Sequence, residues 1–366
     1  MPSRRGRTGT VKIGGFDHIE PVLTGGSNAV VIQTMWKDRL HFAQLEGASG
    51  EAITERIRRL WDMGCRLLRF AVPDIEAAEV LGLLAARVSM PLVADVHFDY
   101  RIALRCLDFP IAKIRINPGN IGARDRVEKV LSRAATKSIP LRIGVNAGSL
   151  PQDLAARVDR RELSRAEALA AAAEREIALF GEFGFSSYLV SMKASSVADT
   201  IKANRLFAER SDAPLHIGVT EAGPLVAGVT RNAVALHALL SEGLGDTVRV
   251  SLSDTMENEV IAAREILNTV DGGRGVNIVS CPRCGRNSFD THGFTRRWLE
   301  RLYSLDKNVT VAVMGCVVNG PGEARHADLG ITGAGNKVLL FAHGRAIRTI
   351  DAAEADQAFL EELEKL

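Results

Sequence analysis

The sequence predicts an N-terminal (β/α)8 barrel of the TIM type, followed by a smaller α+β domain. Through residue 270, short β-branched runs alternate with segments of helical period, and the pair recurs eight times. Eight such units in about 270 residues are typical of a closed parallel barrel. An open doubly wound sheet more often has fewer units and carries a dinucleotide-binding glycine motif, which we do not find. The barrel is therefore the favoured fold.

The barrel strands are predicted where short apolar runs end in polar residues. They cover residues 29–35, 67–72, 92–97, 113–117, 141–146, 188–193, 215–220 and 247–252. Helical period is clearest between these runs, at residues 51–64, 74–88, 124–137, 165–184 and 196–210. We therefore assign residues 1–270 to the barrel, as the domain that binds a substrate.

The pattern changes after the sequence DGGRG, residues 271–275, which is typical of a hinge. Residues 271–366 are predicted to form a separate α+β domain of ordinary size. Strands are expected in NIVSC and TVAVMGC, a helix in FTRRWLERLYSL, a hairpin in KVLLFAHGRAIRTI, and a closing helix in AEADQAFLEELEKL.

The composition argues against several classes of partner. There are 46 basic and 44 acidic residues, so the net charge of +2 gives no reason to expect nucleic acid or a membrane surface. We find no apolar run of about 18 residues, which excludes a predicted membrane span. The basic first dozen residues are predicted to be a solvated, disordered arm. Five cysteines, an odd number, argue against a disulfide framework and indicate a reducing, cytoplasmic setting.

Five cations lie on or at the ends of the predicted barrel strands. They are Arg69, Arg115, Arg142, Lys193 and Arg249. Side chains alternate along a strand, so a polar set shares one face, which we expect to point into the barrel near its carboxyl-terminal mouth. The other members of that set are Asp95, His97, Asn117, Asn146, Thr220, Glu221 and Ser251.

Internal ion pairs could explain one or two of these cations but not all five. Asp95 and Glu221 are too few to neutralise them, and uncompensated buried charge is unfavourable. A ligand with several negative charges resolves the imbalance, and guanidinium groups suit phosphate geometry. The sequence therefore predicts a phosphorylated or diphosphorylated small molecule.

The cysteines of the second domain suggest a metal centre. Cys281 and Cys284 form a C-x-x-C pair, which alone is ambiguous between zinc, a redox dithiol and an iron–sulfur cluster. Cys316 is a third thiol, and Glu323 follows it beyond a Gly-Pro-Gly turn. No second cysteine pair completes a usual zinc site, so a 4Fe-4S cluster is favoured over zinc. Cys65 and Cys106 are expected to be core residues.

Motifs along nearly the whole chain resemble one family. They are VADVHFDYRIAL (93–104), RINPGNIG (115–122), RIGVNAGSL (142–150), SMKAS (191–195), GVTEAG (218–223), LSEGLGDTVRVSL (240–252), SCPRCGR (280–286) and GCVVNGPGEA (315–324). In this order they resemble the 4-hydroxy-3-methylbut-2-en-1-yl diphosphate synthases, the IspG or GcpE family of the non-mevalonate isoprenoid pathway. The bacterial form of that family has the same two-domain layout.

The resemblance implies a reaction and a cofactor. The reaction is the two-electron reductive ring opening and dehydroxylation of 2-C-methyl-D-erythritol 2,4-cyclodiphosphate. The cofactor is a 4Fe-4S cluster held by Cys281, Cys284, Cys316 and Glu323, with ferredoxin or flavodoxin as electron donor. Glu323, the weaker iron ligand, is expected to yield its place to the substrate. A head-to-tail homodimer is also implied, in which the cluster of one subunit caps the barrel of the other.

The resemblance further implies roles for the residues of the barrel mouth. Glu221 would handle protons, with Asp95 and His97 beside it at the reacting end. The substrate would be held by Arg69, Arg115, Asn117, Arg142, Asn146, Lys193, Thr220, Arg249, Ser251 and Asn319.

One loop departs from the family pattern, and three alternatives stay open. After the first barrel strand the family commonly has Ser-Met-Thr-Asn/Thr-Thr, whereas this chain has Gln33-Thr34-Met35-Trp36-Lys37-Asp38. The alternatives are a phosphate-binding lyase or aldolase with a structural zinc domain, a non-catalytic iron–sulfur protein, and a pterin-binding barrel methyltransferase. Metal content and ligand preference discriminate between these classes.

Overall fold

The computed structural model describes residues 6–272, 275–318, 322 and 325–366. The chain divides into two compact units, residues 1–270 and 271–366, and each unit has its own core. Two residues of the predicted hinge, Gly273 and Arg274, lie outside the described residues.

The first unit is a parallel barrel, and all eight predicted strands are confirmed. Its strand order is β8-β7-β6-β5-β4-β3-β10-β9, with every neighbouring pair parallel. A parallel bridge between Val190 and Leu215 connects β8 to the segment that leads into β9. The strands are β3 (Val31–Met35), β4 (Cys65–Ala71), β5 (Leu92–Asp95), β6 (Lys113–Ile116), β7 (Leu141–Asn146), β8 (Tyr188–Lys193), β9 (His216–Ile217) and β10 (Thr247–Val248).

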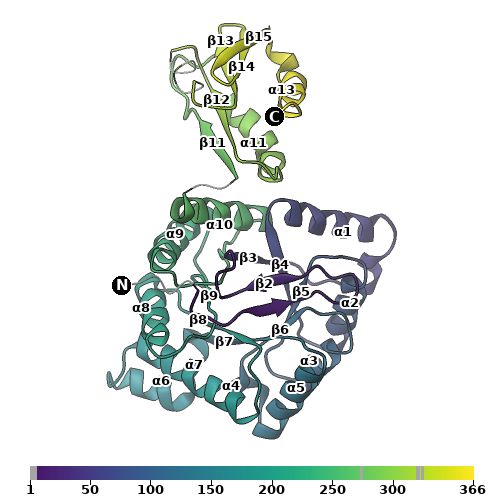
Figure 1. Ribbon diagram of the computed structural model, residues 1–366, viewed down its shortest axis with the longest axis vertical. Helices are drawn as coiled ribbons and strands as arrows, with labels where there is room; N and C mark the ends of the chain where they lie inside the picture. Colours follow the sequence, from purple (N-terminus) through teal and green to yellow (C-terminus); the bar gives the residue numbers. More distant parts are fainter. Residues whose placement is uncertain (1–5, 273–274, 319–321, 323–324) are drawn as a thin grey trace. The chain divides into compact units, whose positions relative to one another are not determined.

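Helices surround these strands in a ring, as Figure 1 shows. The ring contains α1 (Gly47–Asp62), α2 (Ile75–Ala85), α3 (Tyr100–Cys106), α4 (Pro118–Ile121), α5 (Arg124–Thr136), α6 (Gln152–Asp159), α7 (Arg165–Glu182), α8 (Val197–Ala208), α9 (Leu225–Ser241) and α10 (Met256–Asp271).

Local sequence explains where the helices begin and which face they bury. In α1, Ile53, Ile57 and Leu60 recur at helical spacing and are buried. α7 begins with a capping box, in which the Ser164 hydroxyl accepts from the Glu167 amide and the Glu167 carboxylate accepts from the Ser164 amide. These signals are strong enough to be predicted from sequence.

An antiparallel hairpin precedes the barrel and was not predicted. It pairs β1 (Val11–Ile13) with β2 (Val22–Thr24), and Figure 1 shows it lying across the strands. Its apolar residues pack against residues at the amino-terminal ends of barrel strands, such as Leu67 and Leu189. The prediction that the first dozen residues form a disordered arm is therefore wrong from Thr8 onward. Alternation around Lys12 buries Val11 and Ile13, and the Thr8 hydroxyl donates to Asp246 at 3.0 Å.

The second unit is a five-stranded sheet in the order β11-β12-β13-β14-β15, parallel from β11 to β13 and antiparallel from β13 to β15. Helices α11 and α13 contribute Phe294, Trp298 and Phe359 to its core. The elements are β11 (Val276–Ser280), α11 (Thr291–Tyr303), β12 (Val309–Met314), β13 (Leu329–Ala334), β14 (Lys337–Ala342), β15 (Arg345–Asp351) and α13 (Ala355–Leu363).

Strand β13 was missed in the sequence because its two glycines interrupt the β-branched pattern. The other predicted elements of this unit are confirmed. Among the described residues, no helix combines the length and the apolar character needed to cross a membrane.

Candidate active site

The carboxyl ends of β4, β5 and β6 bring one carboxylate between two guanidinium groups. Arg115 Nη1 donates to Asp95 Oδ1 at 3.0 Å, and Arg69 Nε lies 3.5 Å from Asp95 Oδ2. Burial alone would raise the pKa of Asp95, but Arg69, His97 and Arg115 hold it well below its usual value. Asp95 is therefore an ionised counter-ion near neutral pH, which suits positioning better than proton donation.

The guanidinium of Arg115 crosses the neighbouring strand β7 at Gly144. It donates through Nη2 to the Gly144 carbonyl at 3.2 Å. A Cβ at Gly144 would lie 2.1 Å from Arg115 Nε, so any side chain there would displace the guanidinium. The glycine in the RIGVN segment is thus required by the close approach of Arg115.

Arg142, on β7, is the most deeply buried arginine of the mouth. Its exposure is 1%, and Nε and Nη1 have no hydrogen-bond partner in the described part of the chain. Burial, with the charges of Arg69 and Arg115, lowers the pKa of Arg142 well below its ordinary value. Buried donors without acceptors are unfavourable, so this side chain is arranged for a ligand that supplies acceptors.

Lys193 ends β8 and is held by a histidine that the sequence analysis did not identify. Lys193 Nζ lies 3.1 Å from His216 Nε2, and His216 Nδ1 lies 2.7 Å from Thr247 Oγ1. Burial, together with Arg142 and Arg69, lowers the pKa of Lys193 well below its ordinary value. Burial and Lys193 lower that of His216 in the same way. His216 therefore remains neutral and fixes the position of the amine.

A second buried lysine, Lys113, begins β6 and was also missed. Its Nζ donates to Gln33 Oε1 at 3.3 Å, and the side chain is fully buried. Burial lowers its pKa well below the ordinary value, with smaller effects from Arg142 and Arg69. Strand alternation could have revealed Lys113, because it shares the face of Arg115 and Asn117.

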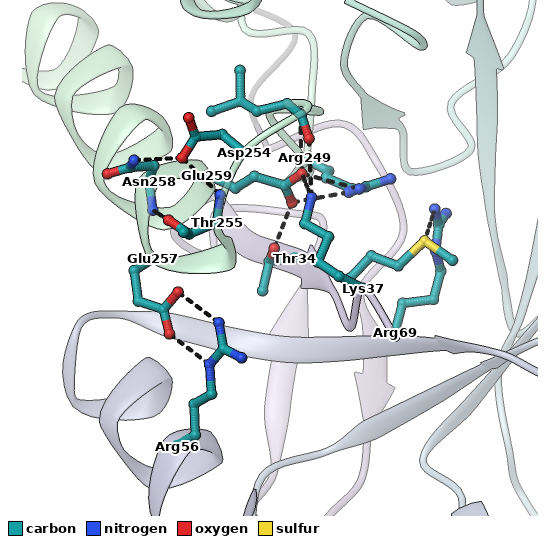
Figure 2. A network of polar contacts seen from close by, with 12 residues as sticks. Thr34, Lys37, Arg56, Arg69, Arg249, Asp254, Thr255, Glu257, Asn258 and Glu259 are labelled. Atoms are coloured by element: carbon teal, nitrogen blue, oxygen red, sulfur yellow. Dashed lines mark hydrogen bonds and ion pairs between the residues drawn. The ribbon is translucent and has the colours of Figure 1, made fainter. Parts of the chain in front are cut away.

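The second buried carboxylate of the mouth is Glu259, which reaches in from α10 (Figure 2). It accepts from Thr34 Oγ1 at 2.5 Å, from Lys37 Nζ at 2.5 Å, and from Arg249 Nη2 at 3.1 Å. Burial would raise the pKa of Glu259, but Arg249, Lys37 and Thr34 lower it below its usual value. Glu259 is thus a buried acid that faces the cations beside Asp95, and the sequence did not point to it.

Glu221 lies on the surface at the end of the segment that follows β9. It is exposed, and its backbone has a φ of 51°, which is uncommon for a residue with a side chain. Strained conformations of this kind cluster at functional sites, so the proton-handling role predicted for Glu221 stays open.

The remaining predicted residues of the barrel lie at the same mouth with different exposure. Asn117 is buried, whereas His97, Asn146, Thr220 and Ser251 are partly exposed. His97 Nε2 lies 2.6 Å from Arg115 Nη1 and 3.5 Å from Asp95 Oδ1. Polar side chains therefore accompany the cations at the mouth.

Charge at the mouth is unbalanced toward the positive. In the ranges that the structure describes, two buried carboxylates, Asp95 and Glu259, face a larger set of cationic side chains. Those side chains are Arg69, Lys113, Arg115, Arg142, Lys193 and Arg249. Such a site is built to bind an anion with more than one charge.

The three cysteines of the second unit are placed by the parallel pairing of β11 and β12. Cys281 directly follows β11 and its amide donates to Val313 of β12 at 2.9 Å, while Cys316 comes two residues after β12. A Cβ at Gly315 would lie 3.6 Å from Cys281 Sγ. Cys281 and Cys316 are partly exposed and Cys284 is exposed, and Cys281 and Cys316 follow the carboxyl ends of two paired strands.

The three cysteine thiols are the type of ligand that an iron–sulfur cluster needs, because such clusters are held by thiolates. Within the described residues, no group of three or more His, Cys, Asp or Glu side chains is assembled to hold a metal ion. Glu323 and Asn319, predicted as a cluster ligand and a substrate contact, lie outside the described residues. The ligand set therefore stays a prediction. Cys65 and Cys106 are buried, and burial raises the pKa of each thiol to about 12, which suits inert core residues.

Comparison with known families accounts for both units. Residues 14–264 match the GcpE TIM-barrel domain, and residues 277–365 match the GcpE protein C-terminal domain. The chain belongs to the GcpE family. The resemblance seen in its motifs is thereby confirmed, and the (β/α)8 barrel with a C-terminal α+β domain agrees with it.

Relatives cover nearly the full length. Proteins of Treponema pallidum and Treponema denticola are 51% and 46% identical to the chain, each over 98% of it and over 92% and 98% of their own lengths. A protein of Thermodesulfovibrio yellowstonii is 41% identical over 99% of both chains. All three are named 4-hydroxy-3-methylbut-2-en-1-yl diphosphate synthase (flavodoxin).

Proposed function

We propose that the chain is a 4-hydroxy-3-methylbut-2-en-1-yl diphosphate synthase of the non-mevalonate isoprenoid pathway. Its substrate would be 2-C-methyl-D-erythritol 2,4-cyclodiphosphate. Membership of the GcpE family and full-length relatives of that name support this function. The observation that carries it is the cationic barrel mouth, above all the buried Arg142, whose Nε and Nη1 have no partner within the described residues.

The diphosphate group of this substrate suits the mouth in charge and in hydrogen-bonding capacity. Its negative charge would be stabilised by Arg142, whose buried Nε and Nη1 lack partners in the described structure. Arg115 and Lys193 would contribute further charge, each oriented by a neighbour: Asp95 for the guanidinium and His216 for the amine. Because these partners fix the donors beforehand, little reorganisation is needed when the anion binds.

The reaction balances as a two-electron reduction. The ring carbon–oxygen bond to phosphate breaks and leaves its electrons on the diphosphate, while a neighbouring hydroxyl takes a proton and departs as water. Two electrons enter the carbon skeleton and a carbon–carbon double bond forms. Among the residues of the mouth, Glu221 and His97 are partly or fully exposed and can exchange protons with solvent. We assign proton delivery to them, and positioning to Asp95.

The cofactor we propose is a 4Fe-4S cluster held by Cys281, Cys284, Cys316 and Glu323. When bound, it would supply single electrons and a Lewis-acidic iron. Flavodoxin, part of the relatives' names, is the proposed donor, with ferredoxin as the alternative. We place the protein in a reducing, cytoplasmic setting, as its odd number of cysteines suggests.

We further propose a head-to-tail homodimer in which the second unit of one chain serves the barrel of the other. The cluster must reach a substrate in the barrel mouth, and the segment joining the two units is short. The family resemblance suggests this exchange of units between two chains, and a closed two-fold dimer is the commonest homo-oligomer.

Anaerobic turnover tests the proposed function. The full chain, reconstituted with iron and sulfide, is expected to convert the cyclodiphosphate to the linear diphosphate with a strong one-electron reductant. Iron and labile sulfide should be present at about four of each per chain, the stoichiometry of a 4Fe-4S cluster. Zinc without iron or sulfide, together with no conversion, would instead support a phosphate-binding lyase or aldolase with a structural zinc domain.

A further inference from the structure

Lys37 lies in the loop that follows β3 and is fixed against the barrel mouth. Its Nζ donates to Glu259 Oε1 at 2.5 Å and to the Leu252 carbonyl at 3.1 Å. An ammonium has three N–H donors, and these contacts within the described part of the chain use two of them. The side chain retains 28% exposure, so the ammonium is held in place and is still accessible from the mouth.

The single carboxylate of Glu259 forms ion pairs with two cations, Lys37 and Arg249. Its Oε1 accepts from Lys37, from Arg249 Nη2 and from the Leu252 amide, and its Oε2 accepts from Thr34 and from Arg249 Nε. Lys37 and Arg249 donate to the same oxygen, which keeps two like charges close together. A lone structural ion pair would need only one of them. Another carboxylate that senses Lys37 is Asp254, whose pKa is lowered by Asn258 and, to a smaller extent, by Lys37, and it is partly exposed.

Arg69 adds to the same side of the mouth, as Figure 2 shows. Its Nη2 and Nε lie 2.8 Å and 3.3 Å from the Met35 sulfur, a weak acceptor. Burial, opposed by Asp95 and reinforced by Arg249, lowers the pKa of Arg69 to about 10. A stronger acceptor, such as a phosphate oxygen, can take these donors from the thioether.

We propose that Lys37 is an additional anion-binding residue of the barrel mouth, with Glu259 as the positioning residue that holds it beside Arg249. The anion class is a phosphoryl group, one half of the diphosphate in the proposed substrate, so the inference rests on the proposed function. It gives a role to a loop that departs from the usual family sequence. Thr34 anchors the start of that loop to Glu259, and Lys37 brings its charge to the mouth.

Binding of inorganic pyrophosphate to the full chain, measured by calorimetry, tests this role without requiring turnover. Lys37→Met keeps the length of the side chain and leaves Arg249 on Glu259, so the fold should be retained, as circular dichroism will check. We expect roughly tenfold weaker binding and a shallower dependence on salt. Lys37→Arg should bind within a few-fold of the parent. Lys129→Met is the matched control, because Lys129 pairs with Asp125 outside the barrel, and should bind as the parent does.

Three results would overturn the proposal. The first is pyrophosphate binding by Lys37→Met within twofold of the parent. The second is absence of pyrophosphate binding by the parent. The third comes from the Arg249→Met background, where Lys37→Met should still weaken binding severalfold because Lys37 contacts the anion itself. Loss of that effect would mean that Lys37 acts only through Arg249. Failure of the parent to convert the cyclodiphosphate, with the Lys37 effect on pyrophosphate intact, would overturn the proposed function and leave the anion site standing.

Discussion

The barrel and the second unit bury different kinds of side chain. The barrel places arginines and lysines inside, with Arg142 at 1% exposure and Lys113 fully buried. The second unit fills its core with aliphatic and aromatic residues, among them Phe294 and Phe359, whose rings meet edge to face. Its reactive groups, the three thiols, lie instead at the ends of strands, where they are partly or fully exposed.

This difference shows two ways to combine a stable fold with chemistry. In the second unit, the packed core and the three thiols occupy separate places, so the described part of the core contains no buried charge that waits for a ligand. In the barrel they share one space, and buried cations without full compensation lower the stability of the unliganded protein. The barrel gains from this a site whose donors are already dry and oriented for an anion.

The largest effect is expected when each unit is disabled in a different chain. Cys316→Ala removes a proposed cluster ligand and Arg142→Ala removes the central cation, so each variant alone should lose at least about a hundredfold in kcat/KM. Mixed as heterodimers, the two variants should recover up to about a quarter of parental activity, because one of two sites in half of the dimers is intact. Each variant mixed with itself is the control. No recovery, with heterodimers demonstrated, would place barrel and cluster within one chain.

A smaller effect is expected from Arg142→Met, which should stabilise the unliganded protein and weaken anion binding. The change replaces a buried, incompletely bonded guanidinium with an apolar side chain of similar length. We expect the free energy of unfolding without ligand to rise by about 1–3 kcal/mol in urea titrations. Binding of pyrophosphate should be lost. Arg133→Met, at an exposed position paired with Asp108, is the control, and destabilisation specific to Arg142→Met would contradict the comparison.

The smallest effect concerns Glu176, a buried carboxyl in α7 that faces Gly119. Burial raises the pKa of Glu176 to about 7, against the opposing effects of the Gly119 amide and Arg175. The unfolded chain has a carboxyl pKa of about 4.3, so the folded state binds more protons between the two values. This contribution to stability is therefore greatest below pH 4.3 and decreases as the pH rises toward 7.

The side chain introduced by Glu176→Gln cannot ionise. The variant should therefore not lose folding stability at this position as the pH rises. We compare the free energy of unfolding of the variant with that of the parent, by urea titration at pH 5 and at pH 8. The difference between them should shift in favour of the variant by about 1–3 kcal/mol from pH 5 to pH 8. Glu128→Gln, at an exposed position on α5, is the control. An equal difference between Glu176→Gln and the parent at both pH values would show that Glu176 does not titrate in this range.

Much of the fold and part of the site follow from local sequence. The eight barrel strands were predictable because apolar runs and helical period alternate, and the cations were found because strand alternation puts Arg115 and Asn117 on one face. The hairpin β1–β2 and strand β13 were not predicted, since short strands and glycine-containing strands carry weak patterns. These strands can be recognised only from the tertiary contacts that they make.

The partners of the cations could not be predicted in the same way. Glu259 meets Thr34 across 225 positions of sequence, and His216 meets Lys193 across 23. One signal was available for Glu259, which lies between the buried Met256, Val260 and Ala263 on the inner face of α10. A carboxylate on an otherwise apolar helix face indicates a buried partner but does not say which one.

The sequence by itself determined the fold class, the family, and the types of residue that carry the chemistry: cations on barrel strands and three thiols in the second unit. These depend on local period and on motifs, which are readable along the chain. Only the tertiary structure decided which charges are paired, that Nε and Nη1 of Arg142 have no partner among the described residues, and that Glu259 is a buried acid of the mouth. Pairing depends on closure of the barrel, which brings β3, β10 and α10 together from opposite ends of the unit and fixes the distances between charges.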